Sequence, residues 1–170
     1  MQRFILAVIL VLGMGFNVRS QIEFEEVLEG EGADFESIRR SSIAFSDVDG
    51  DGDEDVLISG INVVSGFQSV SNLYINNNGD FSLSINALFE GAYDGSIDFA
   101  DIDNDGDEDV LITGSTSTSS FPRLYLNNSG NFTLVSNVPF LPVTSSCSEF
   151  ADIDNDGDED LLIAGFNSGA

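Results

Sequence analysis

The chain has 170 residues with 30 Asp and Glu against five Arg, and it contains no Lys and no His, so its formal charge is −25. We expect no nucleic-acid partner and no binding to anionic lipid, since phosphate binding relies on clustered Lys and Arg. Because the chain has no His and no Lys, the Ser-His-Asp triad, His-ligated zinc and Schiff-base chemistry are excluded. We therefore expect no enzymatic activity from these 170 residues.

Residues 1–20 have the pattern of a secretory signal peptide. A positively charged start precedes an apolar run over 4–16, and Val18 and Ser20 stand at −3 and −1 of a cut before Gln21. The apolar run is shorter than the roughly 20 residues of a membrane-spanning helix. We therefore expect a secreted or cell-surface protein without a membrane span after cleavage.

The remaining region, 21–170, is an internal repeat. One line of sequence occurs three times, at 45–60, 99–114 and 150–165, with steps of 54 and 51 residues between the first Asp of each copy, Asp47, Asp101 and Asp152. A second shared line, at 73–81 and 124–132, follows the first two copies. Such periods indicate units that pack on their neighbours.

Each unit offers four strands. One enters an acidic loop, an apolar strand leaves it, and two more form a hairpin at 73–75 and 81–85, or at 124–126 and 132–135. Asn78-Gly79 is a two-residue turn signal, with Ser129-Gly130 as its counterpart. No stretch sustains helical periodicity, so the fold class is all-β.

Four strands in about 51 residues match one blade of a β-propeller. We divide the region into an orphan outer strand and lead-in at 21–40, a blade at 41–93, a blade at 94–145 and the start of a third blade at 146–170. The orphan strand, 24–28, would complete the last blade of a closed ring. About three units cannot close a ring of 4 to 8 blades. We expect a partial propeller from a longer protein, with an open arc or closure by oligomerisation as alternatives.

The acidic loops have the pattern D-x-D-x-D-G-D-E-D. Asp at positions 1, 3, 5 and 9 and the carbonyl at position 7 can surround one ion if Gly at position 6 turns the chain sharply. Oxygen ligands and high charge favour Ca²⁺ over Mg²⁺ and transition metals, so we expect about one Ca²⁺ per loop, three in this chain. The predicted ligands are Asp47, Asp49, Asp51, Asp53 and Asp55; Asp101, Asp103, Asp105, Asp107 and Asp109; and Asp152, Asp154, Asp156, Asp158 and Asp160.

Two other interpretations of these loops are open. They could be solvated acidic turns, although so many carboxylates within nine residues repel one another without a cation. They could be EF-hand or dockerin loops, but these need Glu at position 12, where the chain has Ile58, Ile112 and Ile163. Side chains at positions 7 and 8, including Glu54, Glu108 and Glu159, are expected to face solvent.

The acidic pattern, the apolar strand and Gly that follow it, and the later L-Y-x-N-x-x-G-x-F line resemble the FG-GAP/VCBS repeats of integrin-α-like β-propellers. The resemblance covers nearly all of residues 24–165. It implies a calcium loop that joins the first two strands of each blade, carried here by the Asp residues named above.

The resemblance and the absent catalytic residues favour a binding module for adhesion, with an extracellular protein or glycan as partner and Ca²⁺ acting structurally. A spacer or accessory domain of a secreted polysaccharide-acting enzyme is the alternative. If the chain were itself an enzyme, the candidate acid and base residues would be Glu90, Asp94, Asp98 and Glu149, although their spacing singles out no pair.

The cysteine and two asparagines also lead to predictions. Cys147 is the only cysteine, cannot form an intramolecular disulfide, and is expected to be a small buried apolar residue. Asn127 and Asn131 fit the acceptor pattern for N-glycosylation, which matters only in a glycosylating secretory pathway.

Overall fold

The computed structural model describes residues 7–9, 24–26, 35–116, 118–120 and 122–167. These residues form antiparallel sheets joined by turns and loops, which confirms the all-β prediction. None of the described residues belongs to a helix that could span a membrane.

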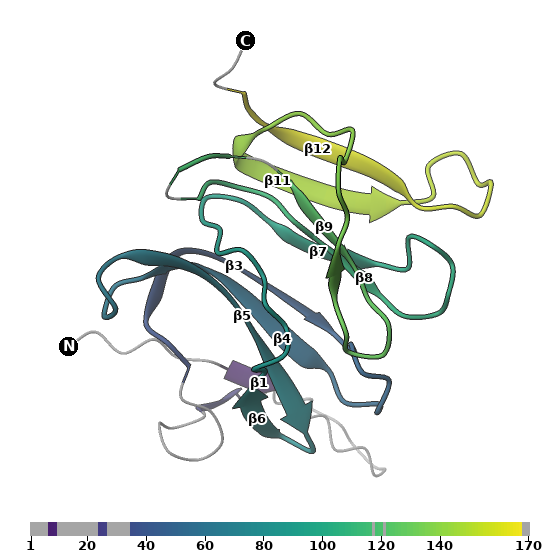
Figure 1. Ribbon diagram of the computed structural model, residues 1–170. Coiled ribbons are helices and arrows are strands. Elements are labelled where there is room, and N and C mark those ends of the chain that lie inside the picture. Colours follow the sequence, from purple (N-terminus) through teal and green to yellow (C-terminus); the bar gives the residue numbers. More distant parts are fainter. Residues whose placement is uncertain (1–6, 10–23, 27–34, 117, 121, 168–170) are drawn as a thin grey trace, which may run out of the picture.

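The three repeat units form three separate sheets, each with its strands in chain order (Figure 1). The first sheet contains β3 (Ile38–Ser46), β4 (Asp55–Asn62), β5 (Gln68–Asn77) and β6 (Asp80–Leu83). The second contains β7 (Ile97–Ala100), β8 (Asp109–Ile112), β9 (Arg123–Leu126) and β10 (Thr133–Leu134). The third contains β11 (Thr144–Ala151) and β12 (Asp160–Phe166). The four strands predicted for each of the first two units are therefore present, in the predicted order.

The hairpin turns also follow the prediction. Asn77 of β5 pairs with Asp80 of β6, which leaves Asn78 and Gly79 as a two-residue loop with positive φ at both residues. This is the backbone conformation that matches the right-handed twist of paired strands. Ser129 and Gly130 also have positive φ in the turn between β9 and β10.

A left-handed residue occurs at the same repeat position of each unit, within β3 and β11 and three residues before β7. In β3, Arg40 and Ser41 together face Gly60 of β4, because the pairing shifts between Arg39 and Ser42. This is a β-bulge. A Cβ on the glycine would lie 2.3 Å from a side-chain carbon of β3, so a larger residue does not fit. The three left-handed residues are Arg40 (φ 55°), Asp94 (φ 54°) and Ser145 (φ 48°).

The sheets pack face to face, with the first strands β3, β7 and β11 beside one another. Because side chains alternate along a strand, each sheet has two distinct faces. We call the side that carries Leu57, Leu111 or Leu162 the leucine face, and the side that carries Phe45, Phe99 or Phe150 the phenylalanine face.

The main core lies between the leucine face of the first sheet and the phenylalanine face of the second. Leu57 and Leu73 from the first sheet contact a cluster that includes Val110, Ile112 and Tyr125 from the second. These side chains are almost completely removed from solvent. Burial of each large apolar side chain contributes about 1.5 to 3 kcal/mol to folding, so the two sheets stabilise each other.

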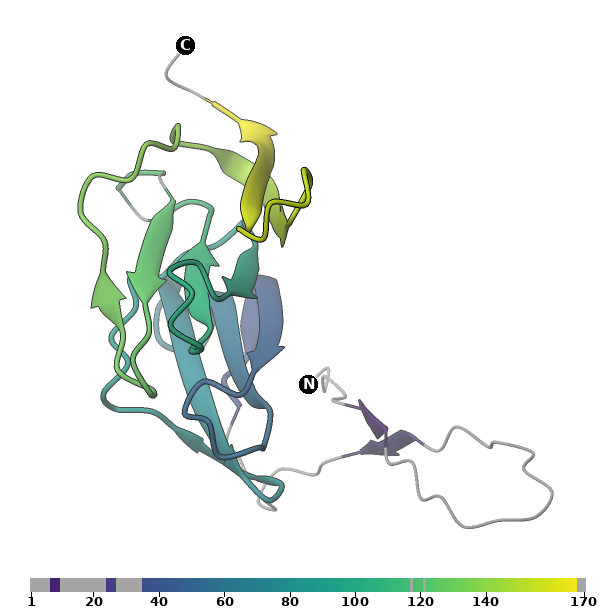
Figure 2. The ribbon, with the colours of Figure 1, turned by 90° about the vertical axis from the view of Figure 1, so that its right-hand side faces the viewer.

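The strand predicted at 24–28 has a different partner from the one expected. β2 (Phe24–Glu26) pairs with β1 (Ala7–Ile9) in a two-stranded sheet that lies apart from the other three (Figure 2). It does not complete the third sheet, and the described residues do not form a closed ring. Except for β1, the predicted signal peptide lies outside the described residues and stays a prediction.

The prediction for Cys147 was wrong, because this cysteine is exposed. It lies on β11, opposite Ala164 of β12, on the leucine face of the third sheet. In the first two sheets the leucine face is covered by the next sheet along the chain, whereas none of the described residues covers it in the third. The position has the character of a core residue, but its surroundings do not bury it.

Candidate metal centres and a polar pocket

Each acidic loop brings three of its carboxylates together. The clusters contain the Asp residues at loop positions 1, 3 and 9, and within each cluster one oxygen of every carboxylate lies within 4.8 Å of the others. The loops follow β3, β7 and β11, and Figure 1 shows them on the same side of the molecule. The clusters are Asp47, Asp49 and Asp55; Asp101, Asp103 and Asp109; and Asp152, Asp154 and Asp160.

The loop backbone is held by the first aspartate. One oxygen of Asp47 accepts hydrogen bonds from the backbone N–H groups of Gly50 and Asp51, and the other accepts from Gly52 at 2.9 Å. Gly52 has φ +95°, as expected for the residue that turns the chain at position 6. The bonds from positions 5 and 6 to Asp at position 1 recur in the other loops, from the N–H groups of Asp105, Gly106, Asp156 and Gly157.

The aspartate at position 9 is the buried member of the first two clusters. Asp55 is 1% exposed, and its two oxygens accept from the backbone N–H groups of Val48 at 3.0 Å and Asn76 at 2.8 Å. Burial raises the pKa of Asp55 to about 6, and the nearby charges of Asp49 and Asp51 also raise it. The two hydrogen bonds oppose this shift, because they favour the carboxylate.

The second loop repeats this arrangement. Asp109 is 0% exposed and accepts from the backbone N–H groups of Ile102 at 3.0 Å and Asn127 at 2.7 Å. Burial raises its pKa as well. In the third loop Asp160 is exposed, although it accepts the equivalent bond from Ile153.

The predicted ligands at position 5 lie outside the three clusters. Asp51 accepts instead from the backbone N–H of Asp53 at 2.9 Å, two residues further along the loop. Asp105 and Asp156 make the same local bond. Their role as ligands, and that of the carbonyl groups at position 7, stays a prediction.

The side chain at position 7 has a role that the sequence prediction missed. Asp53 accepts from the backbone N–H of Asn78, and Asp107 accepts from that of Ser129 at 2.8 Å, so each holds the hairpin turn of its own unit. The signal in the sequence was the second shared line at 73–81 and 124–132, which recurs with the loops. The glutamates at position 8, Glu54, Glu108 and Glu159, are exposed as predicted.

Asn127 connects two units. Its side-chain Nδ2 donates to the carbonyl of Val48 in the first acidic loop at 2.9 Å and to the carbonyl of Glu108 in the second at 3.1 Å. The side chain is buried and fully engaged, so it is not accessible as a glycosylation acceptor. Asn131 is exposed, and its amide donates to two carbonyls of its own turn.

The donor sets fit a hard divalent cation. Each cluster offers only oxygen atoms, and in the first two clusters the position-9 carboxylate is removed from water beside two further carboxylates. Carboxylates held this closely repel one another, and burial adds to the cost of their charge. A bound cation would remove this cost, whereas a merely solvated acidic turn gives no reason to bury Asp55 and Asp109.

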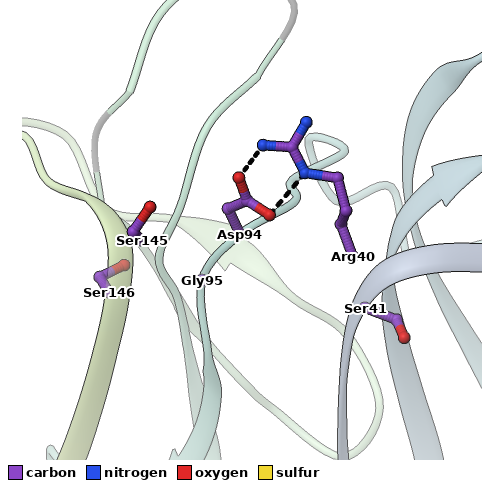
Figure 3. Close-up of a pocket in the computed structure, with 6 residues that line it drawn as sticks. All are labelled: Arg40, Ser41, Asp94, Gly95, Ser145 and Ser146. Carbon is purple, nitrogen blue, oxygen red and sulfur yellow. Dashed lines mark hydrogen bonds and ion pairs between the residues drawn. The ribbon is translucent and has the colours of Figure 1, made fainter.

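The three left-handed residues Arg40, Asp94 and Ser145 meet in a polar pocket of about 310 Å³. Arg40 Nε donates to Asp94 at 2.6 Å and Nη2 forms a second bond to the same carboxylate, as Figure 3 shows. The Arg40 guanidinium also lies over the Tyr93 ring, 4.7 Å from its centroid. The pocket is lined by Arg40, Ser41, Asp94, Gly95, Ser145 and Ser146, two consecutive positions from each unit.

The four carboxylates considered as acid and base candidates do not form one site. Glu90 pairs with Arg123 at 2.5 Å, and Asp94 pairs with Arg40. Asp98 accepts from the Ser148 hydroxyl, and burial raises its pKa. Glu149 is exposed on the leucine face of the third sheet. The first three are thus each held by a different partner.

Comparison with known proteins identifies the repeat. The profile of a family described as FG-GAP-like repeat matches residues 47–112 and again residues 101–163. Each match begins at the first Asp of an acidic loop and ends shortly after the next loop, so together they cover all three loops and more than half of the chain. No curated protein matches the chain.

Proposed function

The chain belongs to the FG-GAP-like repeat family, and from this membership we propose that it is a secreted, calcium-binding β-propeller module that mediates adhesion through an extracellular protein or glycan ligand. Each four-stranded sheet would be one blade, and the third sheet the start of another. The ions would be structural, one in each acidic loop, and the pattern of residues 1–20 supports export.

The observation that carries the calcium assignment is the threefold recurrence of the same carboxylate cluster on the same loop backbone. In each loop the residues at positions 1, 3 and 9 would hold the ion, such as Asp47, Asp49 and Asp55 in the first. Oxygen-only ligands on an open loop suit Ca²⁺ better than Mg²⁺, which requires a tighter octahedron.

Calcium would act as a clamp between strands. Asp47 directly follows β3, Asp55 is the first residue of β4, and Asp55 also holds the backbone of Asn76 in β5. An ion shared by Asp47 and Asp55 would therefore connect three strands of one sheet. At about a hundredfold excess of Ca²⁺ over its Kd, each site would add about 2.7 kcal/mol to the free energy of unfolding.

The ligand would bind at the opposite end of the sheets from the acidic loops. The polar pocket there is formed by the Arg40–Asp94 ion pair and three serine hydroxyl groups, and no apolar side chain lines it. Hydroxyl groups of a glycan can donate to Asp94 and accept from Arg40, and polar side chains of a protein can do the same. Its polar chemistry favours an uncharged polar ligand over an apolar one.

The experiment for calcium is a calorimetric titration of the full chain with Ca²⁺ and with Mg²⁺. We expect Ca²⁺ to bind more tightly, and the substitutions Asp49→Asn and Asp103→Asn each to remove one site. Glu54→Gln is the matched control, because Glu54 is exposed in the same loop and lies outside the cluster. Equal Ca²⁺ titrations for all four proteins would contradict the assignment.

A glycan and surface-protein array would test the adhesive role. We expect a ligand that binds the full chain and does not bind the Arg40→Ala variant, since the substitution removes the guanidinium from the pocket. If no ligand binds, but a longer polypeptide with these repeats acts on a polysaccharide, the alternative role as a spacer or accessory domain is favoured.

A further inference from the structure

The sheets of this protein pack through one type of contact, used twice. At the first junction, the leucine face of the first sheet meets the phenylalanine face of the second, where Leu57 is 0% and Ile97 is 5% exposed. At the second junction, Leu111 on the leucine face of the second sheet is also 0% exposed. There the hydroxyl groups of Ser96 and Ser148 lie 2.7 Å apart across the junction.

Among the described residues, one face of each kind has no sheet packed on it. On the first sheet the face is covered in part, because Phe35 packs on Tyr74, which is 2% exposed. On the phenylalanine face of the first sheet, Ile43 is 48% and Phe45 is 53% exposed, although the equivalent Ile97 is buried in the second sheet. On the leucine face of the third sheet, Leu162 and Phe166 are each 65% exposed. Monomeric proteins rarely leave such contiguous apolar surfaces uncovered.

The two open faces are complementary, because they are the two halves of the contact that already occurs inside the molecule. Leu162 occupies the repeat position of Leu57 and Leu111, ten residues after the first Asp of its loop. Phe45 occupies the repeat position of Phe99, two residues before that Asp. We propose that a second copy of this chain docks the leucine face of its third sheet on the phenylalanine face of the first sheet.

This contact is head-to-tail, since it joins two different surfaces of the same chain. Each copy therefore keeps one free face of each kind, and addition can continue until the rotation between copies closes a ring. The contact would bury Ile43 and Phe45 of one copy against Leu162 of the next, as Ile97 and Phe99 are covered by Leu57 within the chain.

One residue limits the strength of this contact. Glu149 pairs with Leu162 on the open leucine face, at the repeat position where the first sheet has Ala44 and the second has Asp98. Asp98 accepts a hydrogen bond from Ser148 of the next sheet. The first sheet has Ile43 at the repeat position of Ser148, and an isoleucine side chain cannot donate such a bond to Glu149. The Glu149→Ala substitution should therefore tighten the association.

The experiment is sedimentation velocity of the full chain over a wide concentration range. The ionic strength should be about 0.15 M, because repulsion between the negatively charged copies is then screened beyond about 8 Å. We expect a concentration-dependent shift to larger species. Phe45→Asp and Leu162→Asp should each abolish the shift, since each places a charge on one half of the contact. Val64→Asp is the matched control, because Val64 is 81% exposed in the turn after β4 and lies on neither face.

Mixing the two defective variants gives the decisive result. The Phe45→Asp chain retains a normal leucine face, and the Leu162→Asp chain retains a normal phenylalanine face, so together they should form 1:1 dimers and nothing larger. At a protein concentration low enough to keep every chain monomeric, circular dichroism melts of both variants should match the unmodified chain, since both side chains are exposed. A chain that stays monomeric at every concentration, or an association that survives both substitutions, would overturn the proposal.

Discussion

The Nδ2 atom of Asn127 lies 2.9 Å from the carbonyl oxygen of Val48, 79 residues earlier in the chain. The bond joins the hairpin of the second unit to the acidic loop of the first, and both groups are buried. Gly130, in the same hairpin, lies so close that a Cβ on it would touch Asp49 at 3.4 Å. The order of the first acidic loop therefore depends on the unit that follows it.

Replacing Asn127 with Ala should destabilise the protein more than the same change at the equivalent Asn76. The substitution leaves the buried carbonyl of Val48 without its donor, which costs about 1 to 3 kcal/mol. Asn76 donates to the carbonyl of Glu54 in its own unit, in an exposed position, so Asn76→Ala should cost less. Urea unfolding of the two variants tests this, and equal losses would show that the bond between units contributes nothing.

Three leucines at one repeat position provide a test of the packing. Leu57→Ala and Leu111→Ala should each cost about 2 to 5 kcal/mol, because each leaves a cavity in a closed core. Leu162→Ala should cost about 0.5 kcal/mol or less in the monomer, because this side chain is exposed. Thermal unfolding at low protein concentration measures all three, and a large loss for Leu162→Ala in the monomer would contradict the assignment of an open face.

The acidity of Asp55 predicts a pH dependence for the metal-free protein. Its pKa rises from 3.8 in the unfolded chain to about 6 in the fold, so the folded state binds the proton more tightly. Its contribution to stability is therefore fully present below pH 3.8 and is lost as the pH rises to about 6. With chelator present, the unmodified chain should lose stability relative to the Asp55→Asn variant as the pH rises over this range. A gain in stability relative to the variant would contradict the burial of this carboxylate.

With Ca²⁺ present the trend should reverse, because the cation requires the deprotonated carboxylate. Binding of Ca²⁺ to the first loop should weaken as the pH falls below about 6. Calorimetric titrations at several pH values would show this directly. The Asp55→Asn variant is the control, since it has no proton to release at this position.

Removal of the Asp53 side chain should loosen the hairpin of the first unit. Asp53→Ala deletes the acceptor for the Asn78 N–H and should lower the free energy of unfolding by about 1 kcal/mol. Asp80→Ala is the matched control, because it removes the same charge from an exposed position at the other end of the turn. Amide hydrogen exchange at Asn78 should rise in the first variant and stay unchanged in the second.

The parts of the structure that the sequence predicted well are those determined by neighbouring residues. The acidic loops and the Asn78-Gly79 turn depend on residues that adopt positive φ and on short-range patterns. The apolar strands that follow each loop became β4, β8 and β12 for the same reason. Their existence needed no knowledge of the tertiary contacts.

The features that the sequence did not predict depend on contacts between units. The exposure of Cys147 is decided by which sheet covers β11, and the pocket at Arg40 and Asp94 requires residues 54 apart to meet. The convergence of positions 1, 3 and 9 without position 5 also arises in three dimensions, since the Asp51 carboxylate accepts from the backbone N–H of Asp53 in its own loop. Sequence spacing alone does not distinguish these outcomes.

The bulge opposite Gly60, Gly114 and Gly165 separates backbone geometry from side-chain identity. The fold requires the left-handed conformation at one residue in or just before the first strand of each unit, yet this residue is Arg40, Asp94 or Ser145 in the three units. A basic, an acidic and a hydroxyl side chain thus occupy the same place on an unchanged framework. Substitution at this position can therefore change the chemistry of the pocket while the sheets that carry it stay intact.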